Sequence, residues 1–121
     1  MRFRVYVELS WFQTLFSQKI VTENTTTISK VAAQKVFMDK VFSDFSIADA
    51  ERVKEIERTT NHDVKAIEYF LKERFDGNAD LAELKEYLHF SCTSEDINNL
   101  AYALMLHHSF KDVMLPALKD L

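Results

Sequence analysis

Glycine, proline and cysteine are almost absent from this 121-residue sequence, which contains one of each, at Gly77, Pro116 and Cys92. Because glycine and proline mark turns and interrupt regular structure, their scarcity indicates an all-α chain. A single cysteine excludes an internal disulfide framework and is typical of a reducing compartment. We therefore expect an all-α protein of the cytoplasm.

Long apolar runs and an excess of basic charge are also lacking. No stretch approaches the roughly 18 apolar residues of a membrane span, and the N-terminus lacks the apolar segment of a signal peptide. The net charge is −4 without a basic cluster, which argues against nucleic-acid binding. Adjacent His107 and His108 would point about 100° apart on a helix and do not match a metal-ligand spacing. We expect no membrane, nucleic acid, metal or cofactor as a partner.

Apolar residues are plentiful, at 47% with ten phenylalanines, and their spacing predicts a single helical domain with its own core. Residues 2–21 fit a strand alternation at Phe3, Val5, Val7, Leu9 and Trp11, and also a helical stripe at Phe3, Val7, Trp11 and Leu15. Their length without glycine or proline favours a helix. We expect a loop at 22–27, helices at 28–42, from Ser46, at 61–75, at 81–88 and from Ser94 towards Pro116, and a turn at 76–78. A continuation of the last helix past the proline would be kinked.

Three segments match the capping-box template, in which serine or threonine is followed three residues later by an acidic residue. They are Ser46 with Asp49, Thr60 with Asp63, and Thr93 with Asp96. The first encloses apolar residues, whereas the other two enclose further hydrogen-bonding groups, more than capping requires. Helix N-termini suit phosphate and carboxylate ligands, so these two segments are candidate anion sites. Simple capping is the alternative.

The same two segments resemble motifs of adenylosuccinate lyase, a family of the fumarase/aspartase superfamily. Thr60-Asn-His-Asp63 is similar to its Thr-x-His-Asp motif, and Thr93-Ser-Glu-Asp96 to the Thr-Ser-x-Asp motif that begins a long bundle helix. The flanking residues resemble the bacterial branch, and the likeness extends over nearly the whole chain, most loosely at residues 1–44.

The resemblance implies a fold and an assembly. Residues 1–92 would be the N-terminal helical domain of the fumarase/aspartase fold, without its own N-terminal start. Residues 93–121 would be the truncated first long helix of the central bundle. The family assembles as a homotetramer through such helices, and the apolar face of the last helix here has few partners, so we expect an oligomer.

The resemblance also implies a substrate site. Asn61, His62 and Asp63 would contact the AMP portion, and Thr93 and Ser94 would bind carboxylate oxygens of the succinyl group or of fumarate. His89 resembles a family histidine near the phosphate. The substrates implied are adenylosuccinate, which is cleaved to AMP and fumarate, and SAICAR, which is cleaved to AICAR and fumarate.

This β-elimination needs a base and an acid. The family supplies them from a serine on a flexible loop and a histidine in a Thr-His-Gly-Gln-like segment, and neither motif is present here. We therefore expect no catalytic residue in the chain, and no activity from the chain alone. The alternatives are another lyase of the superfamily and a non-catalytic helical interaction module derived from such a lyase.

Overall fold

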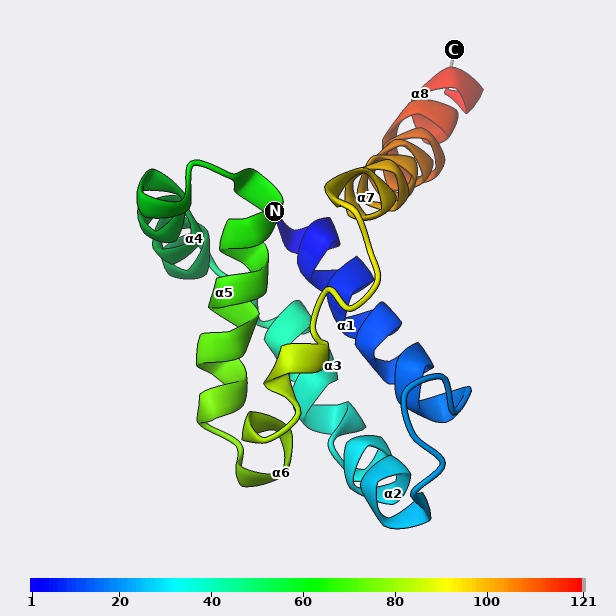
Figure 1. Ribbon diagram of the computed structural model, residues 1–121. Helices are drawn as coiled ribbons and strands as arrows, with labels where there is room; N and C mark the ends of the chain where they lie inside the picture. The colour runs from blue at the N-terminus through cyan, green and yellow to red at the C-terminus, as the bar shows by residue number, and fades with distance from the viewer. Residues whose placement is uncertain (121) are drawn as a thin grey trace.

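The structure is a computed structural model that describes residues 1–120, and its regular elements are helical throughout that range, which confirms the all-α prediction. In chain order they are α1 (Arg2–Ser17), α2 (Thr25–Ala33), α3 (Lys35–Ser43), α4 (Ile47–Thr60), α5 (Asp63–Asp76), α6 (Ala79–Ala82), a 3₁₀ turn (Lys85–Tyr87), α7 (Ser94–Ser109), a π-helical segment (Phe110–Met114) and α8 (Leu115–Lys119). Figure 1 shows α1 running beside α3 and α7, and α5 also packs against α1.

The core is built around α1, the segment whose pattern fitted both strand and helix. Val7 and Leu15 of the predicted helical stripe are buried, and Phe3 and Trp11 are partly buried. Val5, Phe12 and Phe16 are buried as well, so the buried face is broader than the predicted stripe. The ring of Phe12 meets that of Phe75 on α5 edge to face at 5.1 Å. Full burial of such a side chain contributes about 1.5–3 kcal/mol, so these contacts are a main attachment of α1 to α5.

The first helix ends earlier than the predicted residue 21. Its last helical residue is Ser17, and Lys19 then adopts a left-handed conformation at φ 57°. The N–H of Ile20 turns back to donate to the carbonyl of Leu15 at 2.8 Å. This is the way many helices satisfy their last carbonyl groups.

The predicted helix at 28–42 is wrong in two respects. It begins at Thr25, because the side chain of Asn24 caps it by accepting from the N–H of Thr27 at 3.1 Å. It is also divided at Gln34 into α2 and α3. The Gln34 amide donates to Asp80 and accepts from Asn78, both at 2.8 Å, so contacts with a distant segment hold the break.

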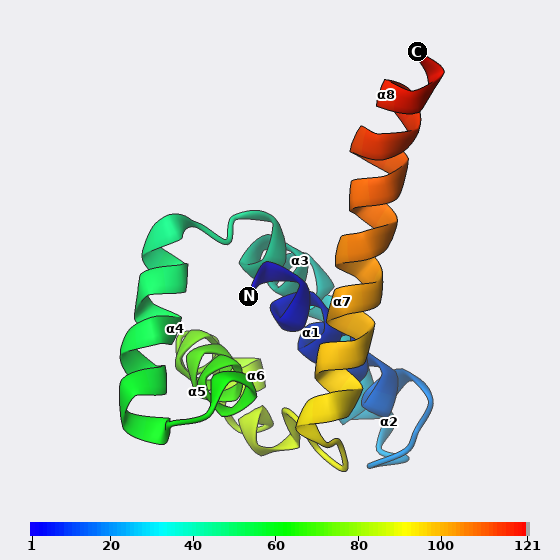
Figure 2. The same ribbon diagram turned by 90° about the horizontal axis from the view of Figure 1, so that it is seen from above.

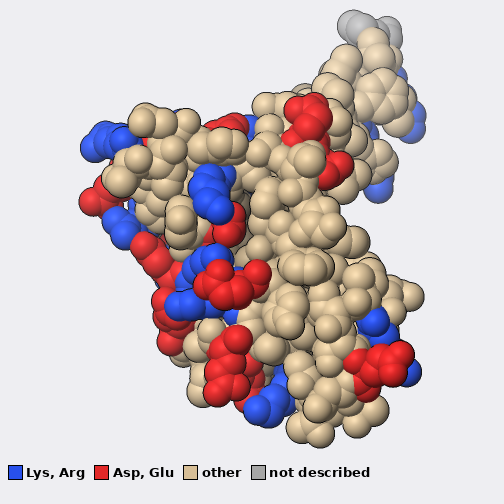
Figure 3. All heavy atoms as spheres, viewed as in Figure 1, with Lys and Arg blue, Asp and Glu red and all other residues tan. Residues whose placement is uncertain are grey.

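α4 and α5 are consecutive helices that pack against each other at a steep angle (Figures 1 and 2), and the start of α4 was predicted correctly. Ser46 and Asp49 make the expected capping box at the start of α4. The expected box of Thr60 with Asp63 is wrong, since Thr60 is the last residue of α4 and His62 is the N-cap of α5. Figure 3 shows acidic and basic side chains intermixed over the side of the molecule formed by these two helices.

The turn predicted at 76–78 consists of Gly77 and Asn78, since α5 ends at Asp76, and the helix expected at 81–88 is wrong as a continuous element. Asn78 caps the single turn α6 by accepting from the N–H groups of Asp80 and Leu81. A 3₁₀ turn follows at Lys85–Tyr87. Leu81 and Leu88 are both buried, so this short segment is held by its packing against the core and not by a continuous helix.

The last helix extends away from the other elements as a rod (Figure 2). Thr93 and Asp96 make the predicted capping box at its start. The helical path continues through Pro116 without a sharp bend, and the irregularity takes the form of the π-helical segment before the proline. Among the described helices, none is long and apolar enough to cross a membrane.

Candidate substrate-binding site

The N-termini of α5 and α7 meet, although they are far apart in the sequence. Nε2 of His62, the N-cap of α5, lies 3.2 Å from Oγ of Ser94, the first residue of α7. Each N-terminus presents backbone N–H groups and the positive end of a helix dipole. The structure thus brings one residue of each predicted segment into direct contact.

The hydrogen bonds of His62 define which ring nitrogen carries its proton. Nδ1 accepts from the backbone N–H of Lys65 at 3.2 Å, so this nitrogen is unprotonated. In the neutral ring the proton is then on Nε2, which donates to Ser94 Oγ. The hydroxyl hydrogen of Ser94 is consequently left to donate to another acceptor, such as a carboxylate oxygen.

Asp63 points towards α1 and not into the His62–Ser94 contact. Its Oδ2 lies 2.7 Å from a guanidinium nitrogen of Arg4, and its Oδ1 accepts from the N–H of Val64 at 2.8 Å. Nε of Arg4 donates to Oδ1 of Asn98 on α7 at 2.7 Å. Arg4 therefore links α1, α5 and α7 behind the site. Sequence reasoning missed this residue, because nothing in the local pattern shows that it reaches these two helices.

Asn61 forms the joint between α4 and α5. It has a left-handed conformation at φ 51°, which asparagine tolerates better than most residues. The N–H of Asn61 donates to the carbonyl of Glu57 at 2.8 Å, and the hydroxyl of Thr60 donates to the carbonyl of His62 at 3.2 Å. Asn61 is exposed, so its side-chain amide is accessible beside the site.

Thr93 is engaged within its own helix. Its hydroxyl donates to a carboxylate oxygen of Asp96 at 2.9 Å and accepts from the backbone N–H of Asp96 at 3.3 Å. Backbone and side-chain hydrogen bonds from Thr93 hold the pKa of Asp96 below its ordinary value. Of the two predicted carboxylate-binding residues, Ser94 thus has the free donor and Thr93 fixes the start of the helix.

His89 lies just before α7 and pairs with a buried acid. Its Nδ1 is 2.6 Å from Oε1 of Glu8, whose side chain is fully buried. The hydrogen bond with Glu8 raises the pKa of His89, although burial opposes it. Sequence reasoning missed Glu8; its position on the buried stripe of α1, one turn from Phe12, was the available signal.

Cys92 is a packing residue. It lies against the small cluster of Val7, Val64, Ile97 and Ala101 that joins α1, α5 and α7. Burial raises the pKa of its thiol to about 11, and the nearby carboxylate of Glu8 adds to this rise. A thiol with so high a pKa is protonated at neutral pH and is a poor nucleophile.

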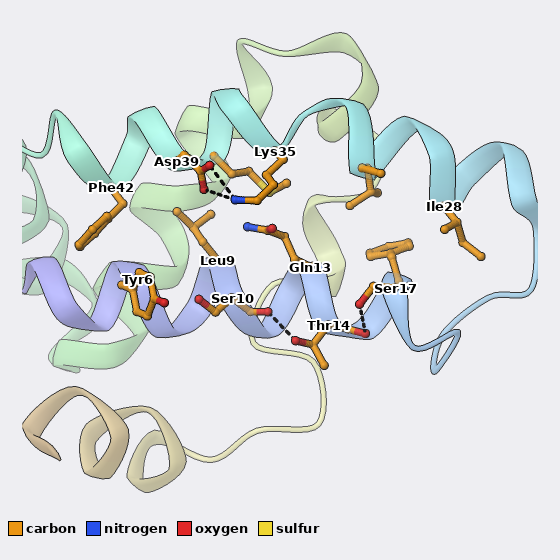
Figure 4. Close-up of a pocket in the computed structure, with 14 residues that line it drawn as sticks. Tyr6, Leu9, Ser10, Gln13, Thr14, Ser17, Ile28, Lys35, Asp39 and Phe42 are labelled. Atoms are coloured by element: carbon orange, nitrogen blue, oxygen red, sulfur yellow. Dashed lines mark hydrogen bonds and ion pairs between the residues drawn. The ribbon is translucent and has the colours of Figure 1, made fainter. Parts of the chain in front are cut away.

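A separate pocket of about 490 Å³ lies between α1 and the α2–α3 pair. Figure 4 shows Ser10, Gln13 and Thr14 of α1 along one wall and the Lys35–Asp39 ion pair on the other. Its lining includes none of the five predicted site residues. The candidate site is therefore the open surface where α5 and α7 begin, and not this pocket.

Comparison with known families shows which family the chain belongs to. The model of the family described as Lyase matches residues 1–121, which is the whole sequence. The chain belongs to this lyase family. The match agrees with the resemblance carried by the two polar segments and with the all-helical fold.

The curated relatives show which enzyme of this lyase family the chain resembles. Adenylosuccinate lyase of Haemophilus influenzae is 50% identical over 116 residues, which are 96% of this chain and 25% of the relative. Adenylosuccinate lyase of Escherichia coli K12 is 46% identical over 121 residues, 100% of this chain and 26% of the relative. The enzyme of Legionella pneumophila strain Corby is 40% identical over 119 residues, 98% of this chain and 25% of the relative. The predicted resemblance to bacterial adenylosuccinate lyase is confirmed, and the chain spans about a quarter of the length of these relatives.

Proposed function

We propose that this chain is the N-terminal, substrate-binding part of an adenylosuccinate lyase. The parent enzyme would cleave adenylosuccinate to AMP and fumarate, and SAICAR to AICAR and fumarate, in the cytoplasm. The observation that carries the proposal is the 3.2 Å contact between His62 and Ser94, which unites the two substrate-binding segments implied by the resemblance. The identity of 40–50% with three curated adenylosuccinate lyases supports the choice of substrate.

The proposed binding mode divides the substrate between the two helix N-termini. Asn61, His62 and Asp63 would contact the AMP portion, with the accessible amide of Asn61 as a direct donor or acceptor. Thr93 and Ser94 would hold carboxylate oxygens at the start of α7. There the dipole and the free N–H groups of the first turn favour negative charge, and the Ser94 hydroxyl adds a donor.

The site would bind substrate but would not complete the elimination. The sequence has no counterpart of the family's base-carrying serine loop or of its histidine segment. Asp96 and His62 are both committed to hydrogen bonds at helix starts. The chain alone would therefore be inactive.

The exposed apolar face of the last helix fits the proposed assembly. Large apolar side chains in this region are about half exposed or more, namely Leu100, Tyr102, Met105, Leu106, Phe110, Val113, Met114 and Leu118. A contiguous apolar surface of this kind is typical of an interface. In the parent it would pack in a bundle of long helices from a homotetramer, with residues 1–92 as the N-terminal domain and 93–121 as the start of the bundle helix.

The test compares the chain with a chimaera. In the chimaera, this chain replaces the region of E. coli K12 adenylosuccinate lyase that aligns with all of its 121 residues. We expect the purified chain to give no turnover of adenylosuccinate, and the chimaera to cleave it. Turnover by the isolated chain, free of host enzyme, would overturn the assignment of a binding role alone. A folded, tetrameric but inactive chimaera would overturn the proposed function and favour a non-catalytic interaction module.

A further inference from the structure

Glu8 is the least expected polar group in the core. It lies on the buried face of α1, its side chain is fully buried, and among residues 1–120 its Oε2 has no hydrogen-bond partner. Removing a carboxylate from water in this way is costly unless a partner compensates for it. The only hydrogen-bonding partner of Glu8 in the described structure is His89, whose Nδ1 lies 2.6 Å from Oε1.

The segment that carries His89 is held against α1 at a second point. Nε1 of Trp11 donates to the carbonyl of Phe90 at 2.8 Å, one turn along α1 from Glu8. His89 and Ser91 have left-handed conformations, at φ 59° and 58°. Such conformations are uncommon outside glycine and persist where the surroundings impose them. The two α1 side chains therefore fix the path of the chain into the start of α7.

The pairing leaves one ring atom of His89 for other contacts. Nδ1 is used by Glu8, and no hydrogen bond of Nε2 occurs among the described residues. The His89 side chain is 19% exposed, whereas that of Glu8 is fully buried, so the accessible part of the pair belongs to the histidine ring. A histidine held through one nitrogen by a carboxylate has a defined proton position and ring orientation.

We propose that Glu8 is a positioning residue that fixes the His89 ring through Nδ1 and, while the ring is protonated, directs its Nε2–H outward as a donor beside the start of α7. The inference rests on the proposed function, in which the ligand at this helix start is an anionic substrate. Glu8 itself does not touch the ligand and acts through His89.

The charges around the pair favour the protonated ring, in which Nε2 carries a hydrogen. The hydrogen bond and the charge of Glu8 raise the pKa of His89, Glu68 adds to the rise, and burial and Lys65 oppose it. Glu68 on α5 is also buried, but its carboxylate is paired with Lys65 at 2.9 Å and Lys72 at 3.1 Å. Asp96 on α7 is near enough for the charge of His89 to help lower its pKa, after the hydrogen bonds from Thr93. Glu8 is thus the acid in contact with His89.

The test is a ¹⁵N NMR titration of the histidine rings in the 121-residue chain, without ligand. In the wild type we expect a midpoint for His89 above the ordinary 6.5. Above that midpoint we expect the neutral ring to keep its proton on Nδ1, where it donates to Glu8. A neutral ring protonated on Nε2, or a midpoint at or below 6.5, would overturn the proposal without any variant.

Two matched variants distinguish the direct contact of Glu8 with His89 from the general effect of nearby negative charge. Glu8→Gln keeps the shape of the side chain and removes its charge, so the His89 midpoint should fall towards 6.5. Glu68→Gln removes a second buried carboxylate that does not touch His89, and it should lower the midpoint much less. Equal shifts in the two variants would contradict a specific role for Glu8. If Glu8→Gln does not fold, the wild-type proton position decides the question.

The link to the reaction is tested in the chimaera. There Glu8→Gln should raise KM for adenylosuccinate above about pH 7 with a smaller change in kcat, and lowering the pH should restore KM. A KM that is unchanged at all pH values, in an active chimaera, would overturn the positioning role. An inactive chimaera without the substitution would instead count against the proposed function, and the ring titration would still decide the role of Glu8.

Discussion

Ser94 Oγ lies 3.2 Å from Nε2 of His62, across the N-termini of two helices whose first residues are 31 positions apart, at 63 and 94. The contact joins the two capped helix starts in one surface. The hydrogen bonds run in one direction, from the backbone N–H of Lys65 to His62 and from His62 to Ser94. The hydroxyl of Ser94, at the end of this series of hydrogen bonds, is the donor that a ligand oxygen would meet.

Replacing Thr93 by alanine should separate capping from ligand binding. Thr93 and Ser46 make the same capping box at two helices, but only Thr93 lies at the candidate site. Loss of an N-cap costs about 1 kcal/mol, so both Thr93→Ala and Ser46→Ala should lower the free energy of unfolding by that amount in urea titrations. In the chimaera, only Thr93→Ala should also raise KM for adenylosuccinate. A similar rise with Ser46→Ala would show that reduced stability alone explains the effect.

Replacing Arg4 by lysine should loosen the support behind the site. The guanidinium of Arg4 contacts Asp63 and Asn98 at once, and a lysine ammonium does not reproduce this forked geometry. Because Arg4 is largely buried, we expect a loss of about 1–2 kcal/mol in the free energy of unfolding. The control is Arg52→Lys, which affects a solvent-exposed pair with Glu73 and should have a smaller effect. Equal losses in the two variants would contradict the linking role of Arg4.

The stability of the chain should fall as pH rises above neutral. The hydrogen bond with Glu8 raises the pKa of His89 in the folded state above its ordinary 6.5. The folded state then binds the proton more tightly than the unfolded state, so the stabilisation is complete below 6.5 and is lost as pH rises through the folded-state pKa. Urea unfolding from pH 5.5 to 9 measures this loss.

The control for the pH effect is His89→Gln, which removes the titrating group. Its stability should change less between about pH 6 and pH 9 than that of the wild type. The variant should also be less stable at low pH, by about 3–5 kcal/mol if Glu8 stays charged and buried without its partner. Parallel pH curves for the wild type and the variant would exclude His89 as the source.

The apolar face of the last helix should drive association. Leu106 and Leu118 are 71% and 58% exposed, and burial of both in a helical interface would remove them from water. We expect the chain to sediment as an oligomer at micromolar concentrations, and the double variant Leu106→Lys, Leu118→Lys to sediment as a monomer. Ile47→Lys is the matched control, since Ile47 is 81% exposed but lies on α4 away from this face. A wild-type monomer at high concentration would contradict the proposed interface.

Some of the fold follows from local sequence because its causes are local. The scarcity of glycine and proline indicated helices throughout, and Val7 and Leu15 of the predicted stripe in α1 are buried. The capping boxes at Ser46 and Thr93 were predicted because serine or threonine, the acid three residues later and the helix start all lie within one turn.

Other features depend on contacts between distant residues and could not be predicted from local patterns. The break at Gln34 is held by Asn78 and Asp80, more than 40 residues later. At residues 60–63 the template fitted Thr60, but the left-handed joint at Asn61 makes His62 the cap. The site residues were proposed from resemblance, whereas the His62–Ser94 contact needed the packing of α5 against α7.

Activity of the chimaera with Asn61 and His62 both replaced by alanine is the most direct test of the substrate-binding role. The account predicts that kcat/KM for adenylosuccinate falls by more than about tenfold, because each lost hydrogen bond to a charged ligand costs about 1.5–3 kcal/mol. The tetramer should remain intact, since the proposed interface lies on the last helix. An unchanged kcat/KM in this double variant would contradict the account and favour a chain whose polar helix starts serve only as caps.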